Sequence, residues 1–303
     1  MDKWLRQILI TLTCLIILAN TLVRAEVNTS AHEPLLVVDR PIEPAVEIKK
    51  LRLNKELKAS ASGQFTASEL SKLFTVIPAL KKHIWIIDLR QESHGFINGL
   101  PVTWYTEQNE INLNKTATQI LAAERELLNN LSKQQKITVY HLNKLVAGKI
   151  SAGESITLIP EDVASEQQLV TNAHGKYQRL YVLDHHRPDD VTVDNFIDFV
   201  RTKVTAEDWL HFHCRGGKGR SSTFMAMYDM LKNSCHTSFV EIIQRQARHG
   251  NVALDKIPTE QAKHWKAGFA QERYEFLQKF YHYASDPNGY GMRNWSAWLE
   301  LRK

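Results

Sequence analysis

The sequence predicts an α/β fold in which strands and helices alternate along the chain. Two short apolar runs, Ile84–Ile87 and Leu180–Leu183, are typical of buried strands, and each is followed by polar residues. A third apolar-rich run, Asp208–His213, leads through a glycine-rich segment into the helical pattern of Ser221–Lys232. Alternation of this kind is typical of a layered α/β architecture.

The remaining elements follow from composition and spacing. Residues 26–45 contain proline and glutamate without periodicity and are expected to form a loose lead-in to one domain over residues 46–303. Strand patterns at residues 46–53, Ile137–Leu142 and Ser155–Ile159 predict a small β subdomain over residues 46–53 and 137–159. Helical spacing is found in Ala67–Phe74, Thr116–Leu131, Glu161–Asn172, Val193–Val204, Ser238–His249 and Gln261–Ala284.

The first 25 residues have the pattern of a secretory signal peptide. Lys3 and Arg6 precede the apolar run Ile8–Leu18, and Val23–Ala25 supplies small residues at a cleavage position. The apolar run is shorter than the roughly 20 residues that a membrane-spanning helix needs. We therefore expect a secreted or periplasmic bacterial protein that keeps no stable membrane anchor once the signal is removed.

Charge and cysteine content narrow the functional classes. Removing residues 1–25 takes away three basic and one acidic side chain, so the net charge falls from +5 to +3. A charge this small does not indicate nucleic-acid binding. The two cysteines that remain, Cys214 and Cys235, are too few for a disulfide framework. A cysteine kept in a glycine-rich segment of an exported protein points to chemistry at the thiol of Cys214.

The glycine-rich segment has the composition of an anion-binding loop. Cys214 and Arg220 enclose five residues, which are Arg215, Gly216, Gly217, Lys218 and Gly219. Glycines allow the backbone to approach a ligand closely, and loop amides together with a helix N-terminus stabilise an anion. Because Lys218 is followed by glycine rather than by serine or threonine, a nucleotide-binding loop of the Walker type is excluded.

These residue types suit attack by a thiolate on a phosphoryl group. The amides, the helix terminus and Arg220 favour the anionic form of Cys214, and the planar fork of Arg220 can hold two phosphoryl oxygens. Ser221 can donate a hydrogen bond to the sulfur, and His213 is placed to orient the loop. This chemistry needs no cofactor or metal, and no ligand spacing suggests one.

A covalent route also needs an acid for the leaving alcohol and a base for the attacking water. The sequence predicts Asp184 for this role, because it ends an apolar run and begins a polar loop that Pro188 stiffens. Asp189 and Asp190 are the rivals, but they lie just before the helix at Val193 and can stabilise its N-terminus.

Taken together, these features resemble the cysteine-dependent protein tyrosine phosphatase (PTP) superfamily, and more closely the bacterial PTP-like phytases, which dephosphorylate inositol phosphates. The matching segments cover most of the chain after residue 25 and are Ser62–Phe65, Asp88–Gly95, Val102–Tyr105, Asp184–His185 with Pro188, Trp209–Ser221, Phe224–Lys232 and Trp295–Leu299. The resemblance implies a PTP-like phosphatase core with a small, partly closed β-barrel inserted.

The resemblance also implies roles for single residues. Cys214 would be the nucleophile, Arg220 the phosphate clamp and Asp184 the general acid, while His185 would contact the substrate. The substrate would be a polyanionic inositol phosphate.

Four further residues are expected near the substrate. Asp88 and Arg90 would lie beside the pocket, although a structural ion pair at a strand end is the alternative for them. Within the loop, Arg215 and Lys218 would add positive charge that favours a highly phosphorylated inositol.

The sequence also departs from the family pattern. Arg187 stands where the family usually has tryptophan. The sequence therefore does not decide how the polar loop that begins at Asp184, here called the acid loop, closes over a substrate. Lys256, Lys263 and Lys266 have no clear alignment with the basic pocket residues of the family. Two alternatives to an inositol polyphosphate phosphatase therefore stay open. One is a phosphatase for phosphotyrosine proteins or phosphoinositides, and the other is a module that only binds phosphorylated ligands.

Overall fold

The structure is a computed structural model that describes residues 34–40, 47–142 and 152–302. The predicted signal peptide, residues 1–25, lies outside these ranges. The helices are α2 (Ala67–Val76), α3 (Ala117–Leu131), α4 (Glu166–Asn172), α5 (Asp190–Thr202), α6 (Gly219–Asn233), α7 (Phe239–Arg248), α8 (Ala267–Ser285) and α9 (Trp295–Glu300), with short 3-10 turns at Lys81–His83, Glu107–Asn109 and Gln261–Lys266. Among the described residues, none of the helices combines the length with the apolar character that a membrane span requires.

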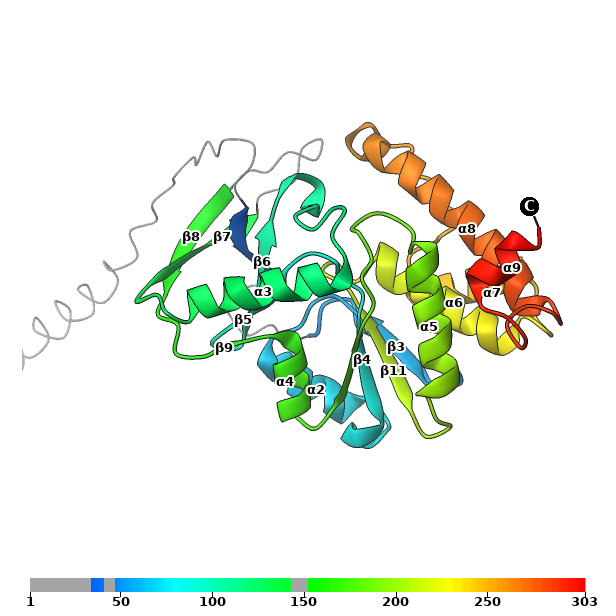
Figure 1. The fold of residues 1–303 in the computed structure, drawn as a ribbon, viewed down its shortest axis with the longest axis horizontal. Helices are drawn as coiled ribbons and strands as arrows, with labels where there is room; N and C mark the ends of the chain where they lie inside the picture. Colours follow the sequence, from blue (N-terminus) through cyan, green and yellow to red (C-terminus); the bar gives the residue numbers. More distant parts are fainter. Residues whose placement is uncertain (1–33, 41–46, 143–151, 303) are drawn as a thin grey trace, which may run out of the picture.

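A five-stranded sheet forms the centre of the fold, between the helices in Figure 1. Its strand order is β10-β4-β11-β3-β2, and the strands are β2 (Arg52–Asn54), β3 (Ala59–Ser62), β4 (Ile84–Asp88), β10 (Lys176–Arg179) and β11 (Trp209–His213). All neighbours are parallel except β2 and β3. The carboxyl ends of β3, β4 and β11 therefore meet at one edge, where His213 is paired with both Asp88 and Ser62. Open α/β sheets bind ligands at such an edge.

Side-chain alternation places this sheet between two hydrophobic layers. In β4, Ile84 and Ile86 pack with α2, while Ile87 faces the opposite core. That opposite core contains Phe212 of β11 and Phe224 of α6, together with side chains of α5, α8 and α9. Burial on both faces explains why the central strands have nearly continuous apolar sequences, and the predicted α/β class is confirmed.

The second sheet lies at the left of Figure 1 and packs against α3. Its order is β8-β7-β1-β6-β5-β9, and the strands are β1 (Leu35–Val38), β5 (His94–Ile97), β6 (Leu100–Tyr105), β7 (Ile137–Leu142), β8 (Ala152–Leu158) and β9 (Val163–Ala164). The strands predicted at residues 137–142 and 155–159 belong to this sheet. The strand expected over residues 46–53 does not, because only β2 forms there and it pairs with β3 of the central sheet.

Two other sequence predictions are wrong in detail. Residues 26–45 are not wholly irregular, because β1 is inserted between β6 and β7. Its four apolar residues form a run too short to show a period. The strand expected at Leu180–Leu183 lies earlier, in β10, an edge strand of polar sequence. The chain leaves the sheet after Arg179, although Leu180 and Val182 stay buried.

Local capping explains where several helices begin. Thr66, Thr116 and Ser165 each form a reciprocal capping box at the start of α2, α3 and α4. Asp189 caps α5 by accepting a hydrogen bond from the backbone N–H of Thr192, 2.7 Å away. The interpretation of Asp189 as a helix-stabilising residue, and not as the catalytic acid, agrees with this contact.

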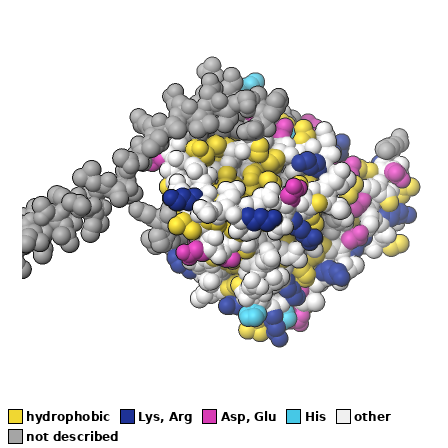
Figure 2. Space-filling model, turned by 60° about the vertical axis from the view of Figure 1, so that its left-hand side comes forward, with side chains coloured by type: hydrophobic (Ala, Val, Ile, Leu, Met, Phe, Trp, Pro, Cys, Tyr) yellow, Lys and Arg dark blue, Asp and Glu magenta, His cyan; other side chains and the backbone are white. Residues whose placement is uncertain are grey.

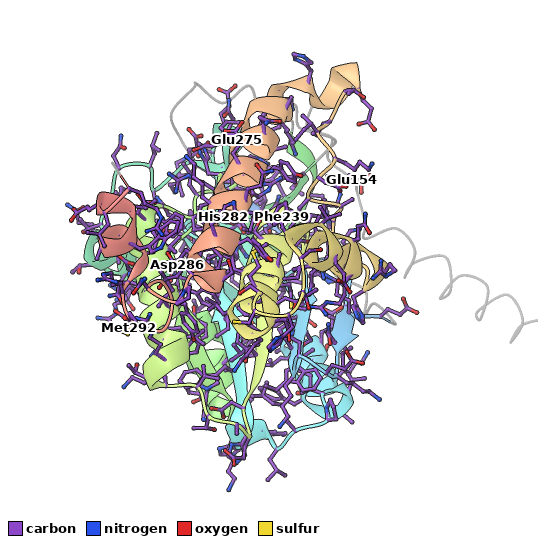
Figure 3. The ribbon with its side chains drawn as sticks, turned by 90° about the vertical axis from the view of Figure 1, so that its right-hand side faces the viewer. Glu154, Phe239, Glu275, His282, Asp286 and Met292 are labelled. Carbon is purple, nitrogen blue, oxygen red and sulfur yellow. The ribbon has the colours of Figure 1, made fainter. Side chains whose placement is uncertain are left out.

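The C-terminal helices cover the outer side of α6. Figure 3 shows α8 running along this side, with Glu275 and His282 on it and Phe239 of α7 beside it. Phe239 contacts Tyr274 and Tyr281 of α8 through ring pairs 5.6 and 5.8 Å apart. The N-terminal part of α8 lies at the carboxyl edge of the central sheet, where Phe269 and Arg273 surround the same space as Cys214.

Candidate active site

The predicted strand, loop and helix are all present at the carboxyl edge of the central sheet. Strand β11 ends at His213, Cys214 follows directly, and α6 begins at Gly219. A cavity of about 640 Å³ opens above this loop, and Cys214, Arg220 and Asp184 all line it. The structure thus brings together the three residues for which the sequence predicted catalytic roles.

Cys214 lies at the floor of the cavity and is only 3% exposed. Burial alone would raise the pKa of the thiol, but the positive charge of Arg220 and the Ser221 hydroxyl outweigh it, so that the pKa is lowered. The Ser221 hydroxyl donates to the sulfur over 3.2 Å. A lowered pKa increases the thiolate fraction, and the thiolate is the nucleophilic form of cysteine.

The loop directs its amides toward the cavity. The carbonyl oxygen of Arg215 accepts from the backbone N–H of Gln64 at 3.2 Å, and that of Gly217 accepts from Arg52 at 2.9 Å. Neither Gln64 nor Arg52 lines the cavity. In a trans peptide the C=O and the following N–H point in opposite directions. The N–H groups of Gly216 and Lys218 therefore point away from Gln64 and Arg52, on the side where an anion can be bound.

Gly217 is the loop position at which glycine is required. Its φ is +65°, and a Cβ there would lie 2.4 Å from the backbone nitrogen of Gly63. Gly216 differs, because a Cβ at that position would meet no heavy atom within 4 Å.

We expect Gly217→Ala to displace the loop, lower the melting temperature and reduce kcat/KM by about 100-fold, since small misplacements of a reacting group carry costs of that order. Gly216→Ala should melt close to the wild type because its methyl group meets no neighbour. Thermal unfolding and phosphate release from nitrophenyl phosphate measure both. Equal melting temperatures for the two variants would contradict the steric argument.

Arg220 is held in place from behind by a buried carboxylate. Glu92 accepts from both terminal nitrogens of Arg220, at 2.6 and 2.9 Å, and the carbonyl oxygen of Val182 accepts at 3.0 Å. Burial would raise the pKa of Glu92, but the charges of Arg220 and Arg90 hold it well below the usual range. The Nε of Arg220 is buried and has no hydrogen-bond partner among the described residues, so it remains available for a phosphoryl oxygen.

Asp184 reaches the cavity from the loop that follows β10. Its carboxylate lies 3.0 Å from a terminal nitrogen of Arg220 and accepts from the side-chain amide of Asn109 at 3.1 Å. Burial would raise its pKa, but Arg220 and His185 lower it, so the carboxyl is ionised at neutral pH without substrate. Asp184 is thus close enough to the phosphate site to exchange a proton with a bound ester.

His185 lines the cavity beside Asp184, at a φ of +70°. Its ring packs edge-on against Trp265, with centroids 4.8 Å apart, and its carbonyl oxygen accepts from Arg273 at 3.1 Å. Burial lowers the pKa of His185 to about 4, so the ring is neutral at pH 7. The position suits the predicted substrate contact.

Arg187 lies outside the cavity lining. It forms ion pairs with Asp190 at 3.2 Å and with Glu272 of α8 at 3.3 Å. Its guanidinium carbon also lies 5.5 Å from the centre of the Phe276 ring. These contacts attach the acid loop to α8.

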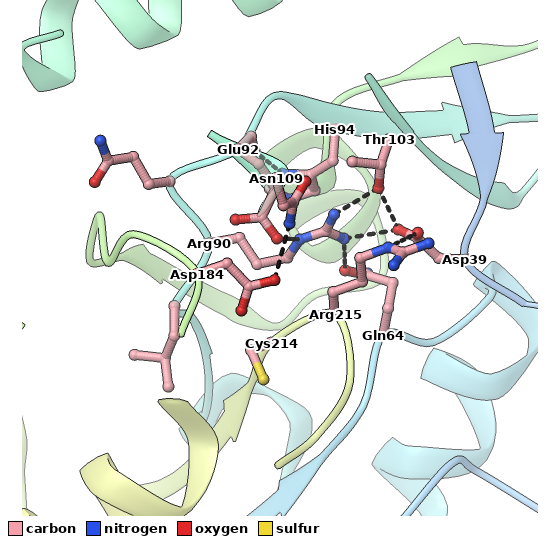
Figure 4. Close-up of polar contacts among 12 residues, drawn as sticks. Asp39, Gln64, Arg90, Glu92, His94, Thr103, Asn109, Asp184, Cys214 and Arg215 are labelled. Carbon is pink, nitrogen blue, oxygen red and sulfur yellow. Dashed lines mark hydrogen bonds and ion pairs between the residues drawn. The ribbon is translucent and has the colours of Figure 1, made fainter. Parts of the chain in front are cut away.

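Asp88 and Arg90 do not contact the cavity, and their expected role as substrate contacts is wrong. Both are completely buried and, unlike Arg220, neither lines the cavity, so the structure gives neither side chain access to a ligand. Arg90 instead lies at the centre of the network in Figure 4, where it donates to Glu92 at 2.9 Å and to Asp39 at 2.9 Å. Both residues are structural, but each forms its ion pairs with other partners: Asp88 with His94 and Arg179, and Arg90 with Asp39 and Glu92. Arg90 acts by fixing Glu92 behind Arg220.

His213 also lies below the loop rather than in the cavity. Its backbone carbonyl accepts from the N–H of Leu89 at 3.0 Å, and its Nε2 is 2.6 Å from a carboxylate oxygen of Glu166. His213, Glu166 and Asp88 place ligand-type atoms within 4.8 Å of one another. The Nε2 of His94 lies between the two carboxylates, 3.2 Å from Asp88 and 3.5 Å from Glu166.

This cluster carries its own balancing charge. Burial and Arg90 work against the charged form of His94, but Asp88 raises its pKa to about 9, so the ring is protonated at neutral pH. Arg179 adds a second positive charge 3.1 Å from Asp88. The carboxylates of the cluster are therefore neutralised by protein groups.

The cavity walls are strongly cationic. Seven lining side chains are basic and two, Asp184 and Glu260, are acidic; the basic ones are Lys49, Arg215, Lys218, Arg220, Lys256, Lys266 and Arg273. On the face drawn in Figure 2 the charges are mixed, and lysine and arginine side chains are scattered among acidic and hydrophobic ones. A concentrated positive potential in a recess favours a polyanionic ligand.

The two basic loop residues contribute unequally to this potential. Lys218 is exposed at the cavity. Arg215 donates to Asp39 at 2.6 Å and lies 4.8 Å from the centre of the Tyr105 ring, so Asp39, which also pairs with Arg90, offsets part of its charge. Among the lysines without a clear alignment, Lys256 and Lys266 line the cavity.

Sequence reasoning missed several residues of the site. Lys49 lies in the segment expected to be a barrel strand, and Arg273 lies inside a long helix. Glu92 offered one signal, because a carboxylate four residues after a buried strand can meet an arginine at the same sheet edge. Asp39 offered none, since it belongs to the segment expected to be irregular.

Comparison with known proteins agrees with this geometry. A family model named PTP-like phytase, with the description inositol hexakisphosphate, matches residues 87–232. A solved PTP-like phytase from Bdellovibrio bacteriovorus is 34% identical, with a TM-score of 0.72 over 90% of this chain and 98% of that one. The chain belongs to the PTP-like phytase family. As a PTP-like phytase, it has the phosphatase core that the sequence predicted.

Two longer proteins are also similar to this PTP-like phytase. A PTP-like myo-inositol phosphatase from Mitsuokella multacida, solved with myo-inositol-(1,3,4,5)-tetrakisphosphate, is 29% identical with a TM-score of 0.83 over 92% of this chain. The effector protein hopD2 of Pseudomonas syringae pv. tomato is 34% identical over 216 residues, which are 70% of this chain. The chain spans about half of each, 49% of the Mitsuokella protein and 45% of the effector.

Proposed function

We propose that this PTP-like phytase hydrolyses phosphomonoesters of myo-inositol polyphosphates through a phosphocysteine intermediate. The observation that carries the proposal is the joint position of Cys214, Arg220 and Asp184 in the lining of one cavity with cationic walls. A solved relative holds an inositol tetrakisphosphate, which supports the same class of substrate.

In the first step the Cys214 thiolate attacks phosphorus, and the bond from phosphorus to the ester oxygen breaks. Arg220 and the amides of Gly216 and Lys218 stabilise the charge on the transferred phosphoryl oxygens. Asp184 donates its proton to the leaving oxygen, which departs as an alcohol.

In the second step water attacks the phosphocysteine. Asp184, now ionised, takes a proton from the water, and the sulfur–phosphorus bond breaks to release inorganic phosphate. Ser221 lies 3.2 Å from the sulfur, and its hydrogen bond stabilises the departing thiolate. The enzyme returns to its starting state without a cofactor.

Asp184 acts as an acid because the substrate changes its surroundings. In the free protein Arg220 helps to keep the pKa of Asp184 low. A bound phosphoryl group shares that arginine and brings negative charge close to the carboxylate, and both effects raise the pKa. Substrate binding therefore favours the protonated carboxyl of Asp184 that the first step needs.

We further propose that the mature protein works outside the cytoplasm, in line with the pattern of residues 1–25.

A comparison of substrates tests the proposal. Purified protein should release phosphate from inositol hexakisphosphate with a higher kcat/KM than from phosphotyrosine peptides, because the cationic walls bind phosphates other than the one being transferred. Preference for the peptides would instead favour a protein tyrosine phosphatase. Binding of inositol phosphates without release from any phosphoester would favour a binding module.

A further inference from the structure

Arg52 lies outside the cavity, behind the glycine-rich loop of residues 214–219, here called the phosphate loop. The proposed reaction assigns Arg52 no role. It belongs to β2, at the edge of the central sheet, and is 7% exposed. Its guanidinium donates to the carbonyl oxygen of Gly217 at 2.9 Å and to the side-chain oxygen of Asn251 at 2.7 Å. A further nitrogen reaches the hydroxyl of Ser222 at 3.3 Å. One buried side chain thus contacts three separate segments of the active site.

The contact with Gly217 controls an anion-binding amide. Because Arg52 holds the Gly217 carbonyl away from the cavity, the N–H of Lys218 in the same peptide is held toward it. Gly217 has no Cβ to restrict the peptide that follows it, so the orientation of this peptide depends on its hydrogen bonds.

The other two contacts reach the wall of the cavity. Asn251 begins the segment 251–260, and seven residues of that segment, from Val252 to Glu260, line the cavity. The backbone N–H of Val252 donates to Ser222 at 2.9 Å, on the same hydroxyl that Arg52 contacts. Arg52 therefore connects the phosphate loop to the wall that carries Lys256.

We propose that Arg52 is a positioning residue that holds the phosphate loop and the wall 251–260 in one geometry. It thereby sets the distance between the transferred phosphoryl group and the part of a polyanionic substrate that meets the wall. The part of the proposal that concerns the wall and a polyanionic substrate rests on the function proposed above. The effect on the phosphate loop holds for any phosphoester.

The residue type fits this role. Burial lowers the pKa of Arg52 to about 10, and the Cys214 thiolate opposes the fall, so the side chain stays charged at neutral pH. Its planar fork can meet three acceptors in fixed directions, whereas the ammonium of lysine is a point charge on a flexible stem. Lysine at this position would keep the charge and lose the connection.

Arg52→Lys and Asn251→Ala separate the two halves of the proposal. We expect Arg52→Lys to lower kcat/KM for nitrophenyl phosphate by about 10- to 100-fold, as for a misplaced catalytic group. It should also raise the pH at which Cys214 becomes reactive toward iodoacetamide. Asn251→Ala frees only the wall, so it should raise KM for inositol hexakisphosphate more than KM for nitrophenyl phosphate.

Arg40→Lys is the matched control. Arg40 is also 7% exposed and pairs with Glu69, but it does not line the cavity or contact the loop. Arg40→Lys should change the melting temperature but leave kcat/KM for nitrophenyl phosphate and KM for inositol hexakisphosphate unchanged. If Arg52→Lys behaved like Arg40→Lys, with altered melting but unchanged kinetics and thiol reactivity, the positioning role would be wrong. Since nitrophenyl phosphate and iodoacetamide need no inositol phosphate, this test remains decisive even if the natural substrate is different.

Discussion

Cys214→Ser is expected to lower phosphate release by at least about 10⁴-fold, whichever phosphoester is supplied. The serine hydroxyl stays protonated at neutral pH, so the nucleophile is lost although the side chain keeps its size and its neighbours. Ser221, Arg220 and the loop amides should remain in place. Thus the variant should still bind inorganic phosphate, which can be followed as a shift in melting temperature.

The second free cysteine provides the control for this experiment. Cys235 is exposed and lies near the end of α6, away from the cavity. Cys235→Ser should therefore keep wild-type activity. Acid quenching of the wild type during turnover should also trap phosphate on Cys214. Substantial phosphate release by Cys214→Ser, or phosphate trapped on a residue other than Cys214, would refute the thiolate route.

The catalytic loop could be predicted from the sequence because its signals are local. The buried strand, the glycines and the helix are adjacent in the chain, so Cys214, Arg220 and Ser221 were placed together without any long-range information. Asp184 was found although the expected strand before it was displaced to residues 176–179. The polar loop that carries it could be recognised without the exact strand boundary.

The contacts of the supporting residues could not be predicted because their partners are distant in the chain. Glu92 meets Arg220 across 128 residues, and Arg52 meets Gly217 across 165. Asp39 contacts Arg90 and Arg215. It directly follows β1, a strand of only four residues that gives little signal in the sequence. Position along a strand says which edge a side chain occupies, but not which charge faces it there.

The same limit explains the error at Asp88 and Arg90. Their place at a strand end correctly indicates the carboxyl edge of the central sheet. Side chains at that edge lie at two depths, an upper level that opens into the cavity and a lower level beneath it. Cys214 occupies the upper level, open to the cavity, whereas Asp88 and Arg90 lie below it and are fully buried. Sequence spacing cannot separate these levels, because the second sheet, which supplies Asp39 and Thr103, closes over the lower one.

Asp184→Asn should produce a loss that depends on the leaving group. An inositol alkoxide leaves only with a proton, so turnover of inositol hexakisphosphate is expected to fall by about 10²- to 10⁴-fold, the usual contribution of a general acid. Nitrophenolate is a stable leaving group and needs less assistance, so nitrophenyl phosphate should lose far less. Equal losses on both substrates would argue that Asp184 acts in another way.

The pH profile gives an independent test of the same residue. As an acid, Asp184 must be protonated in the substrate complex. Where the first step limits turnover, wild-type kcat should therefore fall as pH rises through the pKa of Asp184 in that complex. In the free protein Arg220 helps to hold the pKa of Asp184 below its usual value. Because a bound phosphoryl group shares Arg220 and adds negative charge, the fall in kcat should lie at a higher pH than the ionisation of Asp184 in the free protein. Asparagine does not titrate, and the alkaline fall in kcat should therefore be absent from Asp184→Asn. If the fall persisted unchanged, the proton would have to come from another group.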